Sequence, residues 1–122
     1  MRSLFLAAAL AVIGPLSAAA QDAAEGEKIY KRLCSVCHIV AKEGPTRQGP
    51  TLFGLVGRKA GSVEGFRYSE ANKKSDLVWS PEILDKYITD PRAVVPGTTM
   101  AFAGLRKADE RAALIAFLAT LK

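Results

Sequence analysis

Cys34-Ser35-Val36-Cys37-His38 brings together both cysteines and the only histidine of the 122-residue chain. Two cysteines three positions apart, followed at once by histidine, form the attachment signature of a c-type haem. Each thiol can form a thioether to one vinyl group of a porphyrin, and the adjoining imidazole can bind the iron through a neutral nitrogen. The motif therefore predicts one covalently bound haem c, joined through Cys34 and Cys37 and ligated by His38.

Other uses of two cysteines fit this chain less well. A zinc site built from several Cys and His ligands has too few of them, because the motif holds every Cys and His in the sequence. A thioredoxin-like pair needs a βαβ context, and the sequence has no such pattern. A small local disulfide stays as the alternative, and the histidine that directly follows Cys37 favours haem.

Composition limits the remaining classes of function. A chain of 122 residues indicates one domain with a modest core, which a large bound cofactor would enlarge. The net charge of +5 is spread along the chain without a concentrated basic tract, which argues against nucleic-acid binding. No nucleophile motif, paired carboxylates or phosphate loop is evident, so we expect no enzymatic activity from the polypeptide itself.

The first twenty residues have the pattern of a secretory signal. A positive start at Met1-Arg2 precedes an apolar run from Leu4 to Ile13, a break at Gly14-Pro15 and three small residues at Ala18–Ala20. We expect cleavage after Ala20 and a mature domain at residues 21–122 in the periplasm. An uncleaved membrane anchor is the alternative, but the run is short for a bilayer and lacks a basic stop-transfer flank.

The mature chain has the pattern of an all-α protein, with three main helices, short helices and Gly/Pro-rich loops. Ser80 and Pro81 are typical of a helix start, and Pro91 disfavours helical geometry in the residue before it. Near the C-terminus, Leu114 and Leu118 belong to an apolar face with helical spacing. The expected helices span residues 22–34, 69–74, 81–90 and 108–121.

These residues resemble a small class I cytochrome c, close to the mitochondrial type and its bacterial relatives. The resemblance runs from Gly26 to Leu118. Its elements are Gly26-x-x-x-Tyr30, the Cys34–His38 motif, Gly49-Pro50-Thr51-Leu52-x-Gly54-Leu55, Gly57-Arg58-Lys59-Ala60-Gly61, Gly65-Phe66-x-Tyr68-x-x-Ala71-Asn72, Trp79, Tyr87, Pro96-Gly97-Thr98-Thr99-Met100 and Phe102-Ala103-Gly104. It implies a small cytochrome c fold wrapped around a single haem.

The resemblance assigns the second axial position of the iron to Met100. Apart from Met1, which the predicted cleavage removes, Met100 is the only methionine. A thioether is a soft, uncharged ligand, and His/Met ligation raises the reduction potential. The alternative is a methionine that fills a gap in the core.

Further roles follow from the resemblance by position. Arg58, Tyr68 and Trp79 match residues that hydrogen-bond the haem propionates. The Gly49-Pro50 segment matches the backbone that accepts the proton of the His ligand. Without the resemblance, core packing would be the better explanation for Tyr68 and Trp79, and a solvated charge for Arg58.

A polar cluster near the methionine sulfur is also implied, formed by Asn72, Tyr87 and Thr98. Two further pairs match the contact where the terminal helices cross, namely Gly26 with Tyr30 and Leu114 with Phe117. We expect the residues at this crossing to be structural.

The expected function is that of a soluble, monomeric, monohaem electron carrier. The resemblance implies a quinol:cytochrome c reductase as donor and a terminal oxidase or photosynthetic reaction centre as acceptor. Positive side chains would steer such partners, and they are fewer here than is common in the family, since Leu33, Ala93 and Thr99 stand where lysine is frequent. The retained cations are Lys28, Arg47, Arg92, Arg106 and Lys107. A haem peroxidase, a gas-sensing four-helix cytochrome and a dedicated subunit of one redox complex are the alternatives.

Overall fold

The computed structural model describes residues 11, 12, 14 and 18–122. Most of the predicted signal segment, residues 1–20, lies outside the described residues, so its cleavage stays a prediction. The five helices of the described part are α1 (Ala18–Leu33), α2 (Glu70–Lys74), α3 (Pro81–Thr89), α4 (Pro91–Val94) and α5 (Ala108–Ala119). The one β element among these residues is an isolated antiparallel bridge between Lys59 and Val78. The predicted all-α class is confirmed.

Helices α3 and α4 share Asp90, which caps the end of the first and the start of the second. The sequence pattern did not predict α4. The predicted stop near Asp90 is confirmed, because α3 ends at Thr89. Directly after it, α4 begins at Pro91, and the Asp90 carboxylate accepts a hydrogen bond from the Ala93 amide at its start. Pro91 therefore ends one helix and occupies the first position of the next, where its missing N–H costs nothing.

Side-chain caps explain where α2 and α3 begin. The Ser80 hydroxyl accepts from the Ile83 amide, as expected at the start of α3, and Ser69 caps α2. The predicted start of the first helix at Asp22 is wrong, because α1 begins at Ala18. Alanine has the highest helix propensity, which outweighs the modest preference for an acidic first turn.

The last helix ends two residues before the predicted Leu121. Thr120 closes α5, and the chain then turns so that the Leu121 carbonyl accepts the Gly54 amide at 2.6 Å. This bond ties the C-terminus to the loops instead of extending the helix.

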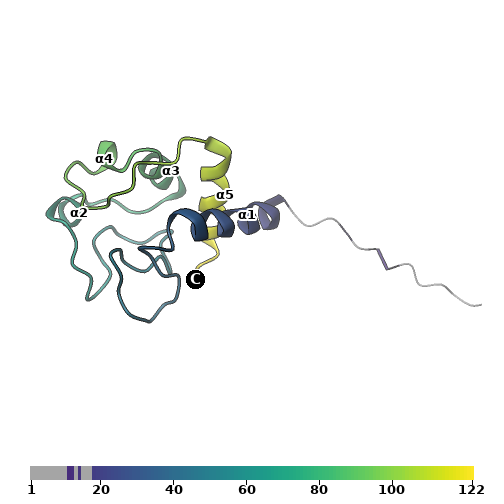
Figure 1. Cartoon of the computed structure of the whole chain (residues 1–122), viewed down its shortest axis with the longest axis horizontal. Coiled ribbons are helices and arrows are strands. Elements are labelled where there is room, and N and C mark those ends of the chain that lie inside the picture. Colours follow the sequence, from purple (N-terminus) through teal and green to yellow (C-terminus); the bar gives the residue numbers. More distant parts are fainter. Residues whose placement is uncertain (1–10, 13, 15–17) are drawn as a thin grey trace, which may run out of the picture.

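The two terminal helices cross and make the most extensive helix contact of the described residues (Figure 1). Gly26 is required at the crossing, because a Cβ there would lie 2.8 Å from Phe117 Cβ and even closer to the Ala113 carbonyl. Ile29 and Leu114 are fully buried beside this contact. The Tyr30 and Phe117 rings pack with their centroids 5.5 Å apart.

Residues 38–69 contain no helix and form long loops on the side of the molecule opposite α3 and α4 (Figure 1). Buried side chains from both sides, including Leu52, Leu55, Leu84 and Ile88, belong to one core cluster with the terminal helices. None of the helices in the described part is both long and apolar enough to cross a membrane.

Candidate haem site

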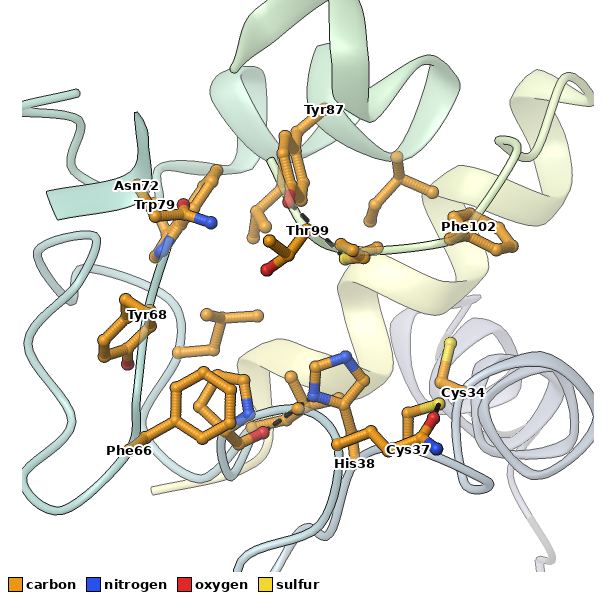
Figure 2. A pocket seen from close by; sticks show the side chains of 18 of the residues that line it. Cys34, Cys37, His38, Phe66, Tyr68, Asn72, Trp79, Tyr87, Thr99 and Phe102 are labelled. Atoms are coloured by element: carbon orange, nitrogen blue, oxygen red, sulfur yellow. Dashed lines mark hydrogen bonds between the residues drawn. The ribbon is translucent and has the colours of Figure 1, made fainter. Parts of the chain in front are cut away.

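A cavity of about 300 Å³ lies within this core, and its lining is mainly apolar. The lining comes from most of the chain, from Leu33 at the end of α1 to Leu118 in α5. All the predicted site residues line it except Thr98, namely Cys34, Cys37, His38, Arg58, Tyr68, Asn72, Trp79 and Met100. Figure 2 shows His38 and the two cysteines along one side, with Tyr87 and Thr99 across the cavity from them.

The His38 side chain is held in one orientation by a backbone carbonyl. Its Nδ1 lies 2.7 Å from the Pro50 oxygen, which confirms the expected contact with the Gly49-Pro50 segment. Because a carbonyl only accepts, Nδ1 carries the proton and Nε2 keeps its lone pair. Burial lowers the pKa of the imidazole below its ordinary value, although the bond to Pro50 opposes this shift. His38 is therefore a neutral imidazole with Nε2 ready to bind a metal.

The loop that follows the motif packs directly on this imidazole. A Cβ at Gly49 would lie within 2.8 Å of three atoms of the His38 ring. The Gly49 amide also donates to the Cys37 carbonyl at 2.9 Å, which joins the loop to the motif. Glycine is therefore needed here for close approach to the ring.

The two thiols lie on the same side of the cavity and are not joined as a disulfide. Burial, and to a smaller extent negative charge on Cys37, raises the pKa of the Cys34 thiol to about 11. Cys37 Sγ is 3.3 Å from Oε1 of Gln48, a residue that the sequence reasoning missed. The sequence feature that could have identified Gln48 is its position as a polar residue directly before Gly49-Pro50.

On the opposite side, a polar cluster surrounds the Met100 sulfur. The Tyr87 hydroxyl lies 3.4 Å from Met100 Sδ and 3.4 Å from the Thr98 hydroxyl. Thr98 in turn is 3.4 Å from Asn72 Nδ2 and 3.3 Å from the Met100 amide. The structure thus brings the predicted cluster together, with Thr98 behind the cavity wall rather than in it.

Arg58 and Trp79 are placed beside each other by backbone pairing. The Trp79 amide donates to the Arg58 carbonyl at 2.9 Å, next to the isolated bridge. Arg58 Nη1 donates to the Phe53 carbonyl at 2.9 Å, but its Nε is buried with no partner. A buried guanidinium N–H without an acceptor is rare and requires an explanation.

A haem propionate would supply the acceptor that Arg58 Nε lacks. Guanidinium groups bind carboxylates through charge-assisted hydrogen bonds. The Tyr68 hydroxyl accepts from the Val63 amide at 3.0 Å, which leaves its own proton to donate to a second group. Together with the apolar lining and the neutral His38 imidazole, these groups fit a haem with its carboxylates toward Arg58.

Two aromatic residues of the cavity wall were not predicted as site residues. Phe66 and Phe102 both line the cavity. Phe66 packs edge-on against Tyr68 with ring centroids 4.7 Å apart, so it fixes the tyrosine ring. Both phenylalanines stand within the glycine-rich stretches of the sequence, and this was the signal that could have identified them.

The sequence model of the cytochrome c family matches residues 23–122. This chain belongs to the cytochrome c family. Cytochrome c 2.1 of Caenorhabditis briggsae is 50% identical over 99 residues, which cover 81% of this chain and 88% of the relative. Cytochrome c of Chlamydomonas reinhardtii is 48% identical over 101 residues, or 83% and 90% of the two chains. Cytochrome c2 of Blastochloris viridis is 43% identical over 118 residues, or 97% and 92%.

Membership of the cytochrome c family confirms the predicted fold and the predicted cofactor. The family binds covalently attached haem c, and this chain has the two cysteines that the attachment needs. Cytochromes c are electron carriers, and the cavity of this chain is lined by both cysteines, His38 and Met100. A monohaem electron carrier is therefore the function class of this protein.

Proposed function

We propose that this cytochrome c is a soluble periplasmic carrier whose haem is attached to Cys34 and Cys37 and ligated by His38 and Met100. The observation that carries the proposal is that the Met100 sulfur and the His38 imidazole line one cavity, each oriented by its own hydrogen-bond partner. When bound, the haem supplies the one-electron chemistry. With both axial positions filled, no position is left for a substrate.

The protein side chains have separate tasks in this proposal. His38 presents Nε2 because Pro50 holds the proton on Nδ1. The Tyr87 hydroxyl lies close to the Met100 sulfur. It would bind one lone pair of this sulfur and leave the other for the iron. Arg58 neutralises a propionate inside the protein, where an unpaired carboxylate would be costly. The apolar lining excludes water from the cavity.

Substitution of Met100 tests the ligand assignment. In Met100→Ala the near-red absorption typical of Met–Fe(III) disappears, the reduction potential falls, and the ferrous protein binds carbon monoxide, which the wild type does not. Thr99→Ala is the matched control, because it shortens the neighbouring side chain and keeps the sulfur. An unchanged spectrum and potential in Met100→Ala, or carbon monoxide binding by the wild type, would refute the assignment and favour an open-site haem enzyme.

For the partners we propose a quinol:cytochrome c reductase as donor and a terminal oxidase or reaction centre as acceptor. Gln48, Thr99 and Ala101 are exposed and line the cavity, so the haem edge would be reached here. The expected cations are all exposed, namely Lys28, Arg47, Arg92, Arg106 and Lys107. They suit transient docking on acidic surfaces.

Turnover with the purified complexes at increasing ionic strength tests these partners. We expect the turnover rate of the wild type to fall as the ionic strength rises. At low ionic strength, we expect Arg92→Gln and Arg106→Gln to turn over more slowly than the wild type. Stoichiometric co-purification with a single complex in high salt would instead identify the protein as a dedicated subunit of that complex.

For the location, the test is N-terminal sequencing of the mature protein after cell fractionation. Removal of the signal predicts Gln21 as the first residue of a periplasmic haem protein. A haem-loaded chain that retains Met1 and stays with the membranes would show an uncleaved anchor.

A further inference from the structure

Tyr30 contacts both ends of the haem-attachment segment. Its backbone carbonyl accepts the amides of Cys34 at 2.8 Å and Ser35 at 3.0 Å, which closes the end of α1. Its hydroxyl reaches past the turn and donates to the carbonyl of His38 at 2.7 Å. One residue therefore holds the first and the last member of the Cys34–His38 segment.

The bond from the Tyr30 hydroxyl has no substitute nearby. Among the hydrogen bonds of the described residues, Tyr30 is the one donor to the His38 carbonyl. Donors of the adjoining segments are already engaged, since the His38 amide donates to Cys34, Arg47 Nη1 to Ser35 and the Gly49 amide to Cys37. Without the hydroxyl, the half-buried His38 carbonyl would lose its partner.

The ring of Tyr30 has a different task from its hydroxyl. The ring is buried at the helix crossing, where it packs against Phe117. Phenylalanine would fill that place equally well. Packing alone therefore does not explain the hydroxyl, and a buried tyrosine O–H needs an acceptor.

We infer that Tyr30 is a positioning residue for the axial ligand, because its hydroxyl fixes the peptide group of His38 and so the direction in which the imidazole leaves the backbone. This inference rests on the proposed ligation by His38. With Tyr30 on the carbonyl, Cys34 on the amide and Pro50 on Nδ1, His38 is fixed at three points. A rotation or tilt of the imidazole would then break at least one of these hydrogen bonds.

Tyr30→Phe in the holoprotein tests the inference, since it removes only the hydroxyl. We expect the amide and Nδ1 protons of His38 to exchange with solvent about five times faster, the effect of losing one ordinary hydrogen bond. We also expect the haem methyl resonances of the ferric protein to shift, because their spread reports the plane of the axial imidazole. Phe117→Leu is the control, because it alters the packing of the Tyr30 ring and keeps the hydroxyl.

Two outcomes would overturn the inference. Exchange and methyl shifts that match the wild type in a folded Tyr30→Phe protein would show that the hydroxyl does not orient His38. Equal changes in Phe117→Leu would show that packing of the ring is the cause. Failure of the proposed ligation itself would look different, because the wild-type spectrum would then lack a low-spin haem with a nitrogen ligand.

Discussion

The two sides of the cavity hold their candidate ligands by different means. On one side, His38 is fixed by contacts of 2.7–2.9 Å in which a backbone atom always takes part. On the other side, Met100 is surrounded by contacts of 3.3–3.4 Å from the side chains of Tyr87 and Thr98. The first set has near-optimal hydrogen-bond lengths, whereas the second set is weaker, because a thioether sulfur is a weak acceptor and the Met100 amide lies 3.3 Å from the Thr98 hydroxyl. Substitutions on the histidine side should therefore cost more stability than those on the methionine side.

The largest effect is expected for Gly49→Ala. The new Cβ would overlap the His38 ring, which cannot move because Pro50 holds its Nδ1. We expect the free energy of unfolding of the ferric holoprotein to fall by about 2–3 kcal/mol in urea titrations. Gly54→Ala is the control, because no atom lies near its Cβ and only its φ of +68° causes strain, at about 1 kcal/mol. Equal losses in the two variants would contradict this view of the histidine side.

An intermediate effect is expected where the segment after Met100 is held to the helices. The Arg111 side chain is only 12% exposed and donates to Asp85 at 2.7 Å and to the carbonyls of Leu105 and Arg106 at 3.1 and 2.8 Å. Asp85→Asn removes the negative charge from this ion pair and leaves the weaker bond of Arg111 to a neutral amide oxygen, which should cost about 1 kcal/mol. In urea, the near-red absorption band should then be lost at a lower concentration than in the wild type.

The control for this substitution is Asp76→Asn. It removes the same charge from an ion pair with Lys59 that is 3.6 Å long and largely exposed. Its cost should be less than about 0.5 kcal/mol. If both variants lose the same stability, the Arg111 contacts do not hold the Met100 segment.

The smallest effect is expected for Tyr87→Phe. The contact of the hydroxyl with Thr98 is long at 3.4 Å, and the Met100 sulfur is a weak acceptor, so little hydrogen-bond energy is at stake. We expect the stability to change by less than about 0.5 kcal/mol, and by less than in Tyr30→Phe under the same conditions. A larger loss in Tyr87→Phe, measured by the same urea titration, would reverse the ranking of the two sides.

The features that the sequence predicted well are local ones. The attachment motif and the cap at Ser80-Pro81 each depend on residues a few positions apart, and both lie where the pattern placed them. The start of α4 was missed although its cap is equally local. Pro91 was taken as a helix stop, and the same residue also suits a helix start.

Contacts between distant segments could not be derived from the residues alone. The shared role of Arg58 and Trp79 and the place of Gly26 at the helix crossing came from resemblance to the family. The backbone pairing of Arg58 with Trp79 and the contact of Gly26 with Ala113 were not predicted, since neither follows from periodicity. The bond from the Tyr30 hydroxyl to His38 was missed altogether, because it spans a helix end and a turn whose geometry no sequence pattern fixes.

The close approach of Gly26 to Ala113 also sets an order of events while the protein is made. The two residues belong to the first and last helices, so α1 has nothing to cross until nearly the whole chain has been synthesised. Closing a contact of such large sequence separation also carries a large cost in loop-closure entropy. Until then Cys34 and Cys37 belong to an unclosed chain, accessible to whatever attaches the haem. The attachment site therefore stays accessible until α5 has been synthesised and has packed against α1.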